Sequence, residues 1–206
     1  MFDAIRVAAW VSVALVVGMI GVFAVTGIGQ DPLQFFHTPE AYGGLLLANP
    51  GALRATIGLD DAFLILYSTV FALLAIRIDR PLVRLGCGLM LVVGLLDVIE
   101  NAHFLAMLAA AEQGIGPGAT EIGAQVIESL VKFHVSYAGL LVLGLGLPRD
   151  TPAERALAVL SVFVQGPIGV AIHVAPRELA VPLVFARFTY FVVALALVGW
   201  AFGRRR

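Results

Sequence analysis

One lysine, Lys132, stands in a stretch of sequence that otherwise reads as membrane-buried, and it is the only lysine among the 206 residues of the chain. Glu128 precedes it by four positions. One apolar stretch earlier, the segment 97–103 reads Asp-Val-Ile-Glu-Asn-Ala-His. Charged groups in hydrocarbon are costly and are normally paired or functional. The pattern therefore predicts a buried polar site in a membrane protein.

Helical spacing places several of these polar side chains together. Asp97, Glu100 and Asn101 are three and four residues apart, so they share one helical face. His103 follows Glu100 by three residues and lies on the same side, one turn further out. Counting residues from the outer helix ends, we expect His103 and Lys132 to lie at a similar depth.

The next helix brings a cation to this face. Glu128 and Lys132 form an i, i+4 pair in the favourable order. The loop at 112–121 is short and glycine-rich, so the two helices are expected to be antiparallel neighbours. Lys132 can then reach Glu100 or Asp97.

A carboxylate, a histidine and a desolvated lysine can supply a general base, a general acid and a stabiliser of negative charge. The predicted catalytic residues are Asp97, Glu100, His103 and Lys132. The predicted substrate-binding residues are Asp61, Asn101, His134, Tyr137 and Arg187.

A cofactor is a second possibility, and its identity is unknown from the sequence. Glu100 and His103 have the Glu-x-x-His spacing of metal-carboxylate helical bundles, which require a second copy that this chain lacks. With Glu128 they form the predicted metal set. A haem held by two of His103, His134 and His173 is an alternative, because each histidine lies on a different helix.

The alternative interpretation is that these polar residues only stabilise the helical bundle. Lys132 would neutralise one carboxylate and lock two helices, and Asp60 or Asp61 would serve as a helix N-cap. This interpretation leaves an excess of acidic groups, which protons, a cation or a metal would have to balance. The acids are Asp61, Asp97, Glu100 and Glu128, against Lys132 and Arg187.

Composition sets the class of protein. Hydrophobic residues make up 60% of the chain and charged residues 13%. These values, with a mean hydropathy of +0.98, are typical of integral membrane proteins. There is no basic face or reader motif, which argues against nucleic-acid binding. The single Cys87 excludes an intrachain disulfide and a cysteine-cluster metal site.

A membrane-spanning helix needs about 20 mostly apolar residues. The chain contains six such segments and is expected to form one all-α domain over residues 1–206. The first segment is interpreted as a membrane-spanning helix rather than a signal peptide, because its apolar core is longer than that of a signal peptide. The expected spans are 7–27, 59–76, 82–111, 122–147, 153–174 and 179–202.

Local chemistry indicates where the fifth span begins and bends. Thr151, Pro152 and Glu154 form a helix-start pattern with a capping side chain, a proline at the first position and an acid at the third. Further along, Gln165-Gly166-Pro167 should kink or break the helix.

Arginines predict the orientation, because cytoplasmic segments of membrane proteins carry an excess of positive charge. With both termini cytoplasmic, the outer loops carry only Arg54 and Arg177. The long outer loop at 28–58 is expected to hold one or two short surface helices, or to be a plain loop. The expected cytoplasmic arginines are Arg6, Arg77, Arg80, Arg84, Arg149, Arg155, Arg204, Arg205 and Arg206.

These features predict an integral membrane protein, in a bacterium located in the inner membrane, with a polar site that opens outward and is roofed by the long outer loop. The favoured function is an enzyme that acts on a lipophilic substrate by acid–base or metal-assisted chemistry. One alternative is a proton- or cation-coupled transporter, although the ionisable groups stop near the membrane midplane. Another is a haem- or pigment-binding subunit of a larger membrane complex. The expected partners are membrane lipids, a lipophilic small molecule or ion, and further copies or subunits.

Overall fold

The computed structural model describes residues 2–203, apart from the side chains of residues 2, 3, 177, 180 and 181, and this part of the chain is built from helices. A short 3₁₀ helix, η1, follows the first α helix, and the remaining elements are α-helical. In order they are α1 (Phe2–Thr26), η1 (Asp31–Gln34), α2 (Pro39–Leu47), α3 (Pro50–Arg77), α4 (Pro81–Glu112), α5 (Ala119–Gly146), α6 (Pro152–Phe163), α7 (Gln165–Val174) and α8 (Arg177–Phe202).

Within the described part of the chain, six helical segments are long and apolar enough to cross a membrane, with α6 and α7 together forming the fifth. Large apolar side chains on their outer surfaces are exposed, among them Ile65, Leu95, Ile127 and Phe163. Such a surface is suited to lipid rather than to water. The prediction of an all-α bundle with six helices able to span a membrane is therefore confirmed.

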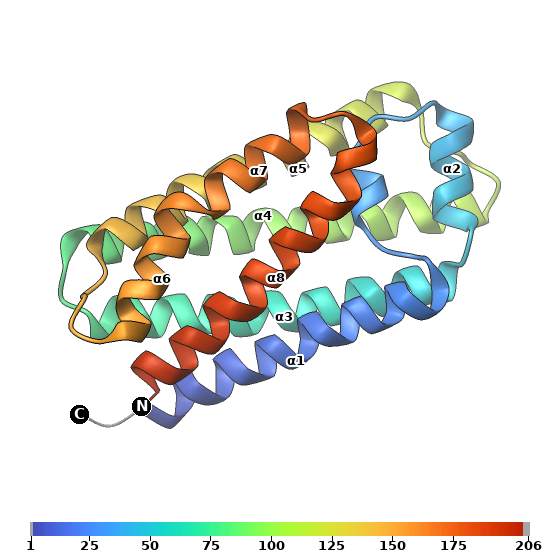
Figure 1. Ribbon diagram of the computed structural model, residues 1–206. Coiled ribbons are helices and arrows are strands. Elements are labelled where there is room, and N and C mark those ends of the chain that lie inside the picture. The colour runs from blue at the N-terminus through green and yellow to red at the C-terminus, as the bar shows by residue number, and fades with distance from the viewer. Residues whose placement is uncertain (1, 204–206) are drawn as a thin grey trace.

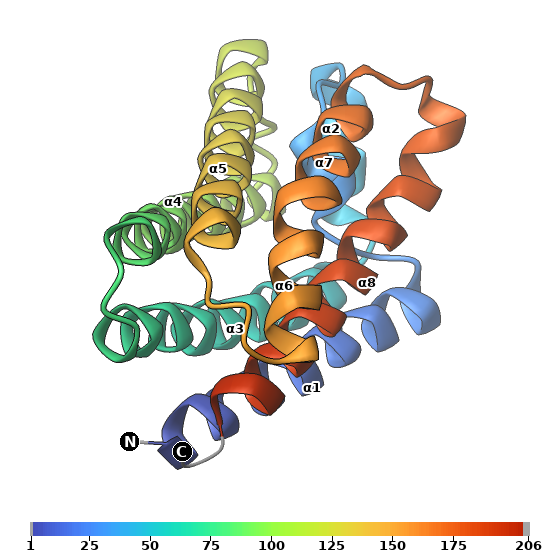
Figure 2. The ribbon, with the colours of Figure 1, turned by 60° about the vertical axis from the view of Figure 1, so that its left-hand side comes forward.

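The spans are arranged as a ring in which each packs against the next in sequence. α1 packs against α3, α3 against α4, α4 against α5, and α5 against α6 and α7. α8 then packs against α6, α7 and α1, which closes the ring (Figures 1 and 2). The start of α1 and the end of α8 lie at the same end of the bundle, opposite α2 (Figure 1). The cytoplasmic assignment of that end stays a prediction, and Arg204, Arg205 and Arg206 lie outside the described residues.

The second span begins earlier than its hydropathy predicts. α3 starts at Pro50, where Asn49 accepts a hydrogen bond from the backbone amide of Ala52 at 3.0 Å. Asp60 and Asp61 therefore lie inside the helix, and the prediction that one of them is the N-cap is wrong. Asn49 is the cap because an asparagine followed by proline satisfies the free amides at a helix start.

The predicted features of the fifth span are confirmed. Thr151 and Glu154 form a complete capping box at the start of α6. The helix breaks after Phe163, and α7 begins at Gln165. Pro167 then lies in the first turn of α7, where its missing amide costs no helical hydrogen bond.

The predicted outer loop contains the short helices η1 and α2, and also the first turns of α3. Gly27 has a φ of +70°, which lets the chain turn sharply at the end of α1. The phenol of Tyr42 on α2 is fully buried and donates a hydrogen bond to the Leu33 carbonyl at 2.9 Å. Burial, reinforced by nearby carboxylates, raises the pKa of Tyr42 above its ordinary value. Tyr42 is therefore a neutral donor that anchors η1.

α4 and α5 approach closely and run antiparallel, as predicted. Glycines permit this approach: a Cβ on Gly86 would lie 2.6 Å from the Leu143 backbone nitrogen, and one on Gly146 would lie 2.7 Å from the Leu82 Cβ. Small residues allow membrane helices to pack backbone to backbone. This contact fixes the register that brings the acidic segment 97–103 against the lysine of α5.

Candidate functional site

Lys132 lies between two carboxylates of the neighbouring helix. Its Nζ is 2.8 Å from Asp97 Oδ1 and also donates to Glu100 Oε2. Glu100 is fully buried and accepts a further hydrogen bond from the Ser129 hydroxyl. The expected convergence of α4 acids on the lysine of α5 is confirmed for both Asp97 and Glu100.

His103 lies one helical turn away from this ion pair. Its Nδ1 is 2.9 Å from Glu128 Oε2, and its Nε2 is 3.9 Å from Glu121 Oε1. The expected similar depth of His103 and Lys132 is therefore wrong by about one turn. The expected pairing of Glu128 with Lys132 is also wrong, because the antiparallel register gives each of them a partner on α4.

The predicted metal set is not brought together. His103 and Glu128 are in contact, but Glu100 bonds to Lys132 and Ser129. Among the side chains that the structure describes, no group of three from His, Cys, Asp or Glu is arranged to hold a metal ion. The structure therefore gives the metal hypothesis no supporting cluster.

His134 and Tyr137 lie on a different side of α5 from the acidic network. The His134 ring is near the rings of Tyr137 and His173, with centroid distances of 5.8 Å and 5.7 Å. His134 is exposed, and its Nδ1 is 2.7 Å from the Leu130 carbonyl oxygen. Of the three histidines considered for haem, His134 and His173 are neighbours, whereas His103 pairs with Glu128.

Asn101 joins two carboxylates of α3 to the network. Its Nδ2 donates to Asp60 Oδ2 and to Asp61 Oδ1, both at 2.9 Å. Its Oδ1 accepts a hydrogen bond from Gln30 Nε2 at 3.0 Å. The predicted residues Asp61 and Asn101 thus lie together, and Asn101 orients both aspartates.

Tyr67 belongs to the site, although the sequence analysis did not identify it. Its hydroxyl donates to Asp97 Oδ2 at 2.5 Å. Asp60, Phe63 and Tyr67 are spaced three and four residues apart, so they occupy one face of α3. This spacing indicates a shared face only if Asp60 lies inside the helix, and hydropathy alone puts Asp60 at the helix end.

The long outer loop roofs the site, as the sequence predicts, through η1 and Gln30 before it, which were not among the predicted site residues. Gln34 Nε2 lies 3.4 Å from Glu100 Oε2, and Asp31 Oδ1 is 2.5 Å from the Arg187 guanidinium on α8. Arg187 is buried and packs over the Phe133 ring, with its Cζ 4.4 Å from the ring centroid. The predicted residue Arg187 therefore holds the roof to α8.

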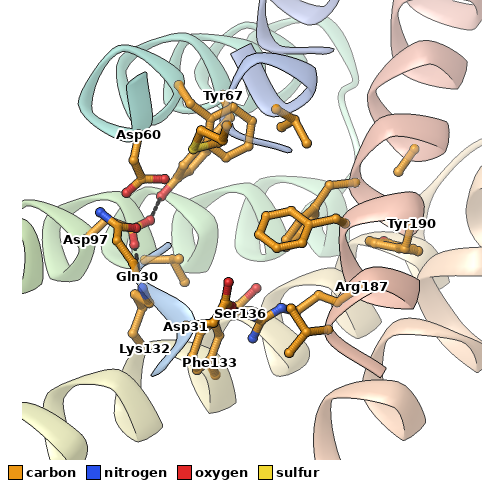
Figure 3. Close-up of a pocket in the computed structure, with 18 of the residues that line it drawn as sticks. Gln30, Asp31, Asp60, Tyr67, Asp97, Lys132, Phe133, Ser136, Arg187 and Tyr190 are labelled. Atoms are coloured by element: carbon orange, nitrogen blue, oxygen red, sulfur yellow. Dashed lines mark hydrogen bonds and ion pairs between the residues drawn. The ribbon is translucent and has the colours of Figure 1, made fainter. Parts of the chain in front are cut away.

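The ring of helices encloses a cavity of about 420 Å³ beneath this roof. Its volume falls within the usual range for small-molecule sites, roughly 300–1,000 Å³. Figure 3 shows Asp60, Tyr67, Asp97 and Lys132 on one side, with Asp31 and Arg187 on another. The rest of the lining is mostly apolar and includes Val70, Met90, Leu140, Leu143, Leu157 and Val198. Glu100 and His103 do not line the cavity.

The polar end carries more negative than positive charge. Asp97 and Glu100 share Lys132, and Asp31 pairs with Arg187. Asp60 and Asp61 have an amide donor but no ion-pair partner among the described side chains. An uncompensated charge is costly in a membrane interior. Protons or a cationic group are needed to balance the site.

Comparisons with protein-family models, curated proteins and solved structures found no match for this chain. The function is therefore inferred from the chemistry of the cavity and of its charged residues.

Proposed function

We propose that the protein binds a lipophilic amphiphile in the cavity and acts on its polar end by acid–base chemistry. The observation that carries this proposal is the division of one cavity into an apolar part and a polar end that contains Asp97 and Lys132. Sites for small molecules are typically apolar with a few placed polar groups. An amphiphile matches both parts of the lining.

The cavity supports a different assignment of roles from the one that the sequence favours. Asp97 lines the cavity and is held between the Tyr67 hydroxyl and the Lys132 ammonium, so it is the proposed general base. Tyr67 is the proposed acid, and Lys132 stabilises negative charge at the reacting end. Glu100 lies behind Lys132 and positions it, whereas His103 has no proposed part in the reaction.

The lining favours this function over transport. A proton- or cation-coupled transporter needs polar groups along a path across the membrane. Here the ionisable lining residues gather at the roofed end, and the part formed by Leu143, Leu157 and Val198 is apolar. In the proposed orientation, the roofed end faces the side opposite the two termini.

Occupation of the cavity can be tested with a filling variant. Ala194 on α8 lines the cavity, whereas its neighbour Val193 is 40% exposed on the outer surface. Wild type, Ala194→Phe and Val193→Phe would be placed in lipid nanodiscs. Saturable binding of radiolabelled decylamine, decanol and decanoic acid would then be measured.

We expect at least one of these amphiphiles to bind, with affinity reduced about tenfold or more by Ala194→Phe and unchanged by Val193→Phe. Absence of saturable binding, or equal effects of the two variants, would contradict the proposal. Catalysis is tested in a separate experiment. The lipophilic molecule that co-purifies with the Asp97→Asn variant is identified, incubated with the wild-type protein, and then analysed for chemical change. Recovery of that molecule unchanged would exclude the catalytic role while leaving binding in place.

A further inference from the structure

We infer that the amphiphile is a lipophilic amine, whose ammonium group binds between Asp60 and the aromatic rings of α3. This inference rests on the proposed function and adds the chemical class of the ligand. It is carried by a carboxyl group of the cavity wall, Asp60, that has no ion-pair partner among the described side chains, by the aromatic rings beside it, and by the existing ion pairs of Lys132 and Arg187.

Asp60 is the carboxylate of the cavity wall that lacks a cation. Asp97, which also lines the cavity, is paired with Lys132, and Asp31 is paired with Arg187. Asp60 accepts one hydrogen bond from Asn101 and has no ion-pair partner among the side chains that the structure describes. A ligand cation would supply the charge that a neutral amide cannot.

Aromatic rings continue from Asp60 along the cavity wall. Phe63 is one turn further along α3, and its ring centroid lies 5.1 Å from that of Tyr67 and 6.5 Å from that of Phe191. All three rings line the cavity. A cation near the face of an aromatic ring is attracted by the ring's quadrupole, and more strongly where water is excluded. A carboxylate next to several rings therefore suits an ammonium group.

The lysine and the arginine of the wall are already engaged in ion pairs, which disfavours an acidic ligand. Lys132 bonds to two carboxylates, and the Arg187 guanidinium bonds to Asp31 while packing on Phe133. An anionic head group would have to displace one of these partners and would approach Asp60 and Asp97. Like charges at such distances repel strongly in a medium of low dielectric constant.

The ligand class can be tested with the same three ten-carbon probes, which differ in the charge of the head group. Binding of radiolabelled decylamine, decanol and decanoic acid to the protein in nanodiscs of zwitterionic lipid is measured, and the signal of empty nanodiscs is subtracted. We expect decylamine to bind about tenfold or more tighter than either of the others.

Two variants test the contacts, and a third serves as a control. Asp60→Asn should lose about tenfold or more in affinity for decylamine and little for decanol, because only the charged contact is removed. Phe63→Leu keeps an apolar side chain but removes the ring, and should also weaken decylamine selectively. Asp79→Asn changes an acid at the surface, 87% exposed beside Arg84, and should change neither affinity.

Each outcome decides between the proposals. If decanol or decanoic acid binds as tightly as decylamine, and this binding is sensitive to Ala194→Phe, the amine assignment is wrong and the amphiphile cavity stands. If decylamine is preferred but Asp60→Asn and Phe63→Leu leave that preference unchanged, the assigned contacts are wrong. If none of the probes binds saturably, the proposed function itself fails.

Discussion

The Asp31 carboxylate of η1 lies 2.5 Å from the buried guanidinium of Arg187 on α8, although 156 positions separate the two residues in the chain. This ion pair connects the roof of the cavity to the last helix of the ring. On the other side, Gln30 and Gln34 attach the roof to Asn101 and Glu100 of α4. The roof therefore spans the cavity and is held at both sides by polar side chains.

Asp31→Asn should loosen the roof, because it leaves the buried Arg187 without its ionic partner. The amides of Leu33 and Phe35 donate to the carbonyls of Gln30 and Pro32. We expect hydrogen exchange of these two amides to become about tenfold faster or more. Exchange measured by mass spectrometry on protein in nanodiscs would detect this change.

Asp79→Asn is the matched control for Asp31→Asn. Asp79 pairs with Arg84 at 3.0 Å, but both side chains are well exposed. Exposed ion pairs contribute little to stability, about 0–1 kcal/mol. Exchange in η1 should therefore match wild type in this variant. Unchanged exchange in Asp31→Asn as well would show that the ion pair does not hold the roof.

Lys132→Met should destabilise the bundle, because it leaves Asp97 and Glu100 in a buried position without their cation. Breaking a buried ion pair from one side typically costs about 3–5 kcal/mol. Adding Glu100→Gln to this variant removes one of the stranded charges and should restore part of the stability. The free energy of unfolding in mixed micelles measures both effects. A double variant less stable than Lys132→Met would argue against charge as the cause.

The sequence was sufficient to predict the spans and the central ion pair. Hydropathy marks six apolar segments, and the short glycine-containing loop makes α4 and α5 antiparallel neighbours. Because Lys132 is isolated in an apolar stretch, it needs an acidic partner, and α4 offers Asp97 and Glu100 at helical spacing. These predictions depend on the local composition of each span and on the short loop between α4 and α5. Both can be read directly from the sequence.

A roof formed by the long outer loop was predicted, but the residues through which this loop reaches the site could not be predicted in the same way. Gln30, Asp31 and Gln34 reach the site because η1 folds over the ring, and this position depends on contacts with residues far away in the chain, such as Arg187. Asp60 was misplaced because hydropathy reports where the apolar part of α3 begins, whereas the Asn49 cap starts the helix earlier. The register between the antiparallel helices α4 and α5 places Glu128 beside His103. This register could not be read from the sequence of α5 alone.

Tyr67→Phe should lower the free energy of unfolding by about 1.5–3 kcal/mol, the usual contribution of a hydrogen bond to a charged group. The ring and its packing are kept, and only the hydroxyl that donates to Asp97 is lost. Tyr190→Phe is the control, since its hydroxyl is 3.2 Å from the neutral Ser161 hydroxyl. That variant should cost less, about 0.5–1.5 kcal/mol. Equal losses in the two variants would indicate that the charge of Asp97 adds nothing to the bond.

Gly86→Ala should destabilise the protein, because the added Cβ would lie 2.6 Å from the Leu143 nitrogen and 2.8 Å from the Gly139 oxygen. Both are backbone atoms, so α4 and α5 would have to move apart, at a cost of about 1–3 kcal/mol. Gly88 lies on the same helix with nothing within 4 Å of an added Cβ. Gly88→Ala should therefore stabilise the helix by about 0.5–1 kcal/mol. Unfolding titrations that gave the same sign for both substitutions would contradict the close approach of the two helices on which the register of Lys132 depends.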